Sequence, residues 1–142
     1  MDLRSMAQLP HYEERKMNSK ERKPWLAIIW FFAWGIFQAY VVYAVINGTW
    51  VRPEAFPEEA YNTLMYPDMF FIPIYFLAAY LLFKQNQFGK IIGLIAGGAM
   101  IYALIYLLAL SKLKGAINLC FDSLFLTINI LAVLQIVKFS KR

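Results

Sequence analysis

The chain has 142 residues, of which 61% are hydrophobic, 18% aromatic and 16% charged, and its formal net charge is +5. A typical soluble domain has about 45–50% apolar and about 25% charged residues, so the composition excludes an ordinary soluble domain and indicates an integral membrane protein. The basic residues cluster between and outside the apolar stretches, without a nucleic-acid-binding motif. We therefore attribute the positive charge to membrane topology and expect no nucleic-acid partner.

The chemistry open to this chain is limited by its single cysteine, Cys120, and its single histidine, His11. One cysteine permits no intrachain disulfide, and the two residues together supply neither a zinc site nor a histidine-based catalytic triad. We expect no metal and no cofactor.

The chain begins with a polar segment, residues 1–24, with six basic and four acidic side chains, which we interpret as a cytoplasmic tail. Residues 25–46 predict a first transmembrane helix, because about 20 apolar residues suffice to cross a bilayer and Pro24 favours a helix start. Within this span, Gly35 and Ala39 form a small-xxx-small pair of the kind that lets another helix pack closely.

Residues 47–67 are predicted to form a net acidic loop outside the cytoplasm, with a short surface helix that begins at Pro57. Residues 68–83 form the predicted second span, and Pro73 lies one turn inside it, where a proline kinks a helix. Asp68, at the outer boundary, has two possible roles. It either caps the helix N-terminus or lies at the mouth of a ligand site.

After a short basic turn, residues 89–110 predict the third span. Gly89, Gly93 and Gly97 recur at every fourth position, and this glycine-zipper pattern provides a face without side chains, along which a second helix can pack. The pattern serves packing and carries no chemistry. We favour a partner helix of the same chain over a second subunit.

Residues 117–138 predict the fourth span, and residues 140–142 form a basic C-terminal end. This span contains an ionisable residue, Asp122, and such groups usually face a bundle interior or a water-filled cavity. At about 100° per residue, Asn118 lies on the same helix face one turn earlier.

Four apolar spans predict an all-α integral membrane four-helix bundle, with up-down-up-down topology through short connections. Placing both termini in the cytoplasm leaves only three basic residues outside, namely Arg52, Lys112 and Lys114, as the positive-inside rule requires. In its size and number of spans the chain resembles small four-span bacterial membrane proteins. This resemblance implies a bacterial plasma membrane.

The polar side chains of the spans are predicted to converge on the outer half of the bundle, while the inner half is nearly pure hydrocarbon. The predicted ligand-binding pocket is lined by Gln38, Asp68, Tyr102, Tyr106, Asn118 and Asp122. The alternative is that these residues form interhelical hydrogen bonds that only fix the register of the helices.

Three functions fit this arrangement. The favoured one is a binding or accessory membrane protein that holds a lipid-like, small apolar or cationic ligand, alone, as a homodimer or within a larger complex. The second is a small proton-coupled transporter with Asp122 as coupling carboxylate, although the first span lacks the glutamate of small multidrug exporters. The third, disfavoured by the missing nucleophile and metal-binding motifs, is an isomerase-like intramembrane enzyme with Asp68 and Asp122 as acid and base.

Overall fold

The computed structural model describes residues 23–52, 57–110 and 116–140. The predicted cytoplasmic tail up to residue 22, the two lysines at 112 and 114, and residues 141–142 lie outside this part. Within it, the prediction of an all-helical chain with four helices long and apolar enough to cross a membrane is confirmed.

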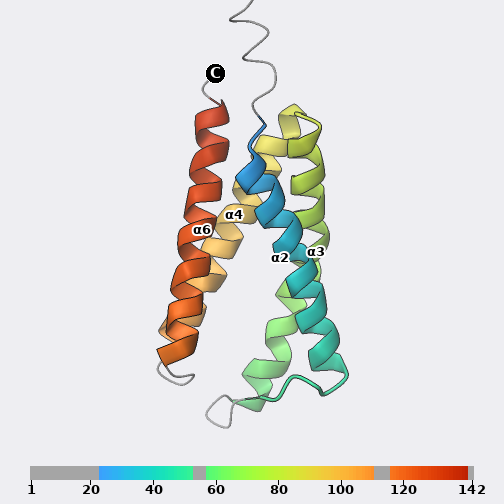
Figure 1. The fold of residues 1–142 in the computed structure, drawn as a ribbon. Helices are drawn as coiled ribbons and strands as arrows, with labels where there is room; N and C mark the ends of the chain where they lie inside the picture. Colours follow the sequence, from blue (N-terminus) through green and yellow to red (C-terminus); the bar gives the residue numbers. More distant parts are fainter. Residues whose placement is uncertain (1–22, 53–56, 111–115, 141–142) are drawn as a thin grey trace, which may run out of the picture.

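The four helices in chain order are α2 (Trp25–Ile46), α3 (Glu58–Phe83), α4 (Gln87–Ala109) and α6 (Ala116–Ser140). Figure 1 shows them side by side as one bundle, in which α2 contacts α3 and α6, and α4 also contacts α3 and α6. Each helix therefore has two neighbours in the bundle and turns its remaining surface outward. Many large apolar side chains on that outer surface are exposed, as expected for helices that face lipid.

Helix α3 is longer than the sequence predicted. The expected surface helix and the second span, predicted as 68–83, form one continuous helix that begins at Glu58 and contains Pro67 and Pro73. Each proline removes one backbone hydrogen-bond donor, but the helix continues past both. In lipid, the other backbone groups have no water to bond to and must form their hydrogen bonds within the helix. Asp68 lies well inside this helix, so its predicted role as an N-terminal cap is wrong.

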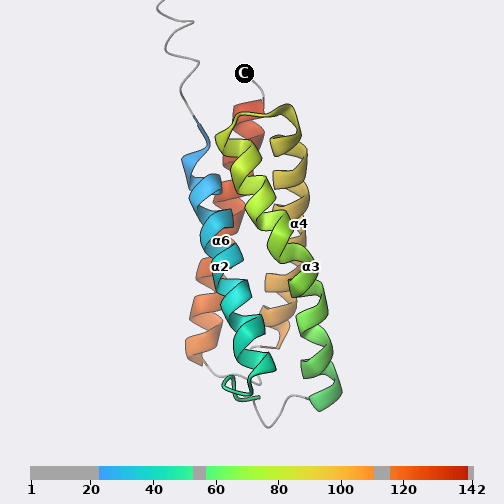
Figure 2. The ribbon, with the colours of Figure 1, turned by 90° about the vertical axis from the view of Figure 1, so that its right-hand side faces the viewer.

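The turn between α3 and α4 brings the two helices into close contact. Asn86 caps α4 by accepting a hydrogen bond from the backbone N–H of Phe88 at 2.9 Å. A Cβ atom on Gly89 would lie 2.7 Å from the backbone carbonyl carbon of Leu81, so only glycine fits there. Figure 2 shows α3 and α4 side by side next to this turn.

Further along α4, two buried glycines lie against the last helix. A Cβ atom on Gly93 would lie 3.0 Å from Cδ1 of Ile136, and one on Gly97 would overlap the side chain of Val133. These contacts show that this face of α4 packs on α6 of the same chain.

The small-residue pair of α2 is divided between the inside and the outside of the bundle. Gly35 is buried, and a Cβ atom there would lie 3.1 Å from the ring of Phe76 in α3. Ala39 is exposed. The close approach of α2 and α3 therefore occurs at Gly35.

Polar side chains also join the helices in the half of the bundle that the sequence predicted to be nearly pure hydrocarbon. Asn129 is fully buried; it accepts a hydrogen bond from Nε1 of Trp30 at 3.2 Å and donates one to the carbonyl oxygen of Gly97 at 2.9 Å. Gln135 accepts a hydrogen bond from the backbone N–H of Ala27 at 3.1 Å. The prediction of an apolar inner half is therefore wrong.

Charged side chains are distributed unequally between the two ends of the bundle. The start of α2, the turn between α3 and α4 and the end of α6 lie at the same end (Figure 1). The described lysines of these segments are Lys23, Lys84, Lys90 and Lys138. The opposite end holds the start of α3, with Glu58 and Glu59 in its first turn.

Candidate ligand-binding cavity

A cavity of about 700 Å³ lies between the helices, near the connection from α2 to α3. All four helices contribute to its wall, as does the start of that connection. Figure 1 shows α6 and α2 spreading apart toward this end of the bundle. Ligand pockets have volumes of about 300–1,000 Å³, so the cavity is large enough for a small amphipathic molecule.

Four of the six predicted pocket residues line this cavity together. Gln38 comes from α2, Asp68 from α3, and both Asn118 and Asp122 from α6. Gln38 and Asp122 are 7% and 9% exposed, Asp68 is half-buried, and Asn118 is exposed at the start of its helix. The structure thus brings polar groups from three helices together, and two of these groups, Gln38 and Asp122, are buried.

The two tyrosines predicted for this pocket lie elsewhere. Tyr102 and Tyr106 are 76% and 40% exposed and are not part of the cavity wall. Each is two residues from the fully buried Leu104, which places it about 200° around the helix from the buried side. Leu107 is the residue of α4 that lines the cavity.

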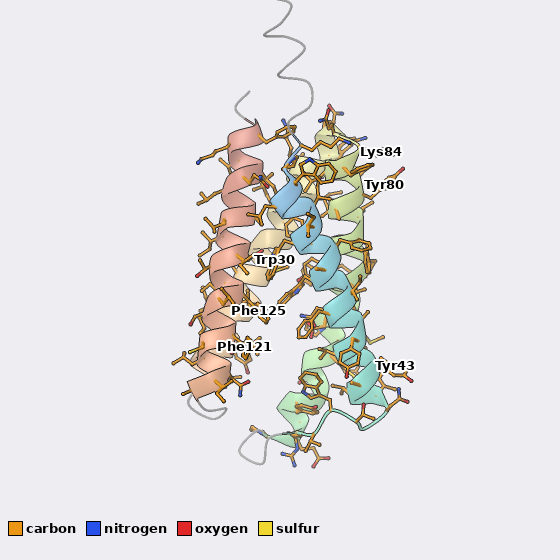
Figure 3. The ribbon with its side chains drawn as sticks, viewed as in Figure 1. Trp30, Tyr43, Tyr80, Lys84, Phe121 and Phe125 are labelled. Carbon is orange, nitrogen blue, oxygen red and sulfur yellow. The ribbon has the colours of Figure 1, made fainter. Side chains whose placement is uncertain are left out.

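Aromatic rings form much of the apolar wall, and the sequence analysis did not single them out. Trp34 lies edge-on to Phe125 with ring centroids 5.6 Å apart, and its centroid is 5.4 Å from that of Phe37. Phe121 extends the cluster along α6, 6.3 Å from Phe125. Figure 3 shows Phe121 and Phe125 on the side of α6 that faces the rest of the bundle. We call these four residues, Trp34, Phe37, Phe121 and Phe125, the aromatic wall.

Sequence reasoning missed the aromatic wall because aromatic side chains occur throughout this chain, on lipid-facing as well as buried positions. The available signal was the spacing of Phe121 and Phe125, which flank Asp122 on the same helix at positions i and i+4. Residues at that spacing lie on neighbouring parts of one helix face.

Beyond the aromatic wall lies a packed layer of Trp30, Met100 and Asn129, none of which lines the cavity. The ring of Trp30 lies 6.0 Å from Phe125 and 5.5 Å from Trp34. Its Nε1–H group lies 3.2 Å from both Oδ1 of Asn129 and Sδ of Met100. Because Asn129 and Met100 are fully buried, this layer ends the cavity toward the middle of the bundle.

The mouth of the cavity is held by a contact between α3 and the connection that follows α2. The hydroxyl of Tyr61 donates a hydrogen bond to the carbonyl oxygen of Trp50 at 2.9 Å, and both residues line the cavity. Burial raises the pKa of the Tyr61 phenol, and the nearby positive charge of Arg52 partly opposes this rise. Arg52 is therefore close to the mouth without belonging to the wall.

The described wall offers two carboxyl groups, two amides, the hydroxyl groups of Thr49 and Tyr61 and several aromatic rings, with no lysine, arginine or histidine. Within the described residues, no three or more His, Cys, Asp or Glu side chains are grouped so as to hold a metal ion. Comparisons with protein-family models, curated proteins and solved structures found no match. The function is therefore inferred from the cavity itself.

Proposed function

We propose that this chain is a multi-pass membrane protein that binds a small amphipathic ligand with a cationic head group in the cavity. The observation that carries the proposal is the composition of the wall. Asp68 and Asp122 reach one cavity from different helices, beside the aromatic wall, and no basic side chain belongs to the described wall.

Each part of the wall suits a different part of such a ligand. A carboxylate attracts an ammonium group more strongly in a medium of low dielectric than in water. Aromatic faces add about 0.5–2 kcal/mol for a cation held over them. The amide side chains of Gln38 and Asn118 offer both donors and acceptors that orient a polar head, while the valines of α2 that line the cavity contact its apolar part.

We further propose an up-down-up-down arrangement in a bacterial plasma membrane, with both termini in the cytoplasm. The end that holds Lys23, Lys84, Lys90 and Lys138 is the cytoplasmic end under the positive-inside rule. The cavity then opens toward the outer face. A ligand would enter from the outer leaflet or from the medium beyond it.

The packed layer of Trp30, Met100 and Asn129 next to the cavity supports binding over transport. Trp30, Asn129 and Met100 join α2, α6 and α4 by buried contacts directly beyond the aromatic wall. A transporter needs a path past this layer, whereas a binding protein needs only the cavity. The proton-coupled transporter and the intramembrane enzyme remain the alternatives.

The proposal is tested by measuring the affinity of the intact protein in lipid nanodiscs for three probes of equal chain length. These are an alkyltrimethylammonium, a neutral alkyl glycol and an alkyl sulfate. We expect the cationic probe to bind best, and Asp122→Asn or Asp68→Asn to weaken its binding about tenfold or more. Each variant removes a carboxylate charge, and two opposite charges about 4 Å apart attract each other by about 4 kcal/mol at an effective dielectric constant of about 20.

The matched control is Glu59→Gln, which removes the same charge from an exposed position on α3 that is not part of the wall. This variant is expected to bind the cationic probe as the unmodified protein does. Equal affinity for all three probes, or an equal loss in Glu59→Gln, would contradict the proposal.

A further inference from the structure

A second hollow lies on the outside of the bundle between α2 and α3. It is a groove of about 390 Å³, lined by Ile28, Phe32, Phe76, Ala79, Tyr80 and Phe83. It shares no residue with the ligand-binding cavity. All six residues belong to the parts of α2 and α3 that are long and apolar enough to cross a membrane, so in a bilayer the groove faces acyl chains.

Two ammonium groups lie at the end of this groove. Nζ of Lys23 is 3.9 Å from the ring centroid of Phe83, and Nζ of Lys84 is 5.9 Å from that of Tyr80. Phe83 and Tyr80 both line the groove. Figure 3 shows Tyr80 and Lys84 close together at this end of α3. The apolar groove thus leads directly to a pair of positive charges.

An aromatic residue marks the same level as the border of the membrane. Trp25 is 50% exposed, and its ring lies edge-on to Phe83 with centroids 6.0 Å apart. Tryptophan side chains are enriched where lipid head groups meet the acyl chains. Lys23 and Lys84 therefore stand at the height of the phosphate groups of the adjacent leaflet.

We propose that this groove is a binding site for one anionic phospholipid of that leaflet. An acyl chain lies along Phe32, Phe76 and Ala79, and the phosphate and its anionic head group lie between Lys23 and Lys84. The apolar surface alone accepts any lipid tail. The two lysines supply the charge complementarity that selects an anionic head group over a zwitterionic one.

The test is native mass spectrometry of the protein released from bilayers of phosphatidylcholine and phosphatidylglycerol. We expect one phosphatidylglycerol to be retained in preference to phosphatidylcholine. The double variant Lys23→Gln with Lys84→Gln should lower this preference about 30-fold, because each lysine near a membrane surface contributes about fivefold.

The control is the double variant Lys90→Gln with Lys138→Gln, which removes the same charge at the same end of the bundle but from α4 and α6. It should retain the preference. A third variant, Phe32→Ala, removes an exposed ring from the groove and leaves both lysines in place, and it should lower retention of the lipid without reversing the head-group preference.

Three results would overturn the proposal. One is equal retention of the two lipids by the unmodified protein. Another is an equal loss of preference in both lysine pairs, which would indicate a general attraction of the basic end for anionic membranes. The third is a lipid-free dimer that is lost in Phe32→Ala, which would show that a second copy of the chain fills the groove.

Discussion

Two adjacent glycines of α4 have opposite surroundings. A Cβ atom on Gly97 would overlap the side chain of Val133, and the carbonyl oxygen of Gly97 accepts the hydrogen bond from Asn129. A Cβ atom on Gly98 would meet nothing within 4 Å. The contact between α4 and α6 therefore depends on the first glycine and not on the second.

This difference predicts opposite effects of the same substitution. Gly97→Ala should destabilise the bundle by about 1–3 kcal/mol, because the added methyl group must displace packed atoms. Gly98→Ala should leave stability unchanged or raise it by up to about 1 kcal/mol through its better helix propensity. Unfolding of both variants in the same detergent measures the difference, and a Gly97→Ala variant as stable as Gly98→Ala would show that the close contact at Gly97 is absent.

Single residues also show where sequence reasoning succeeded and where it stopped. Asp122 was identifiable because a carboxyl group in an apolar span is costly in lipid. The role of Asn129 was not identifiable, because its partners Trp30 and Gly97 are 99 and 32 residues away. A residue can be recognised as polar from its sequence alone, but its hydrogen-bond partner depends on the relative register of two helices.

At the scale of helices, the sequence predicted four apolar elements because length and hydropathy suffice for that. It did not predict the continuity of α3, because Pro67 and Pro73 are usual signs of a helix break. It also placed Tyr102 and Tyr106 on the wrong side of α4. That helix is apolar over most of its surface, so its sequence gives no strong signal for which side faces the bundle.

The starts of α3 and α4 lie at opposite ends of the bundle and give a direct test of orientation. In a chain whose only cysteine is removed by Cys120→Ala, Glu58→Cys should react with a membrane-impermeant maleimide in intact cells. Gln87→Cys should react only after the cells are permeabilised. Both native side chains are exposed, so accessibility depends on the side of the membrane. Labelling of Gln87→Cys alone in intact cells would reverse the proposed orientation.

Across the whole molecule, the closest helix packing and the cavity are separated along the axis of the bundle. Toward the lysine end, the hydrogen bonds of Asn129 and Gln135 and the contacts of Gly89 and Gly93 hold the helices close together. Toward the other end, α6 and α2 diverge (Figure 1) and the cavity lies between them. The tightly packed end can thus fix the helices while the open end accommodates a ligand.

The central claim is that the cavity holds the head group of a cationic amphiphile, and photochemical cross-linking tests it most directly. The probe is an alkyltrimethylammonium with a diazirine next to its head group, added to the protein in nanodiscs, and the modified residues are mapped by mass spectrometry. We predict modification at the aromatic wall, near Phe37 and Phe121, that is lost in the Asp68→Asn, Asp122→Asn double variant. Modification confined to exposed positions of α4 such as Ile91 and Leu94, with the same yield in that variant, would contradict the claim.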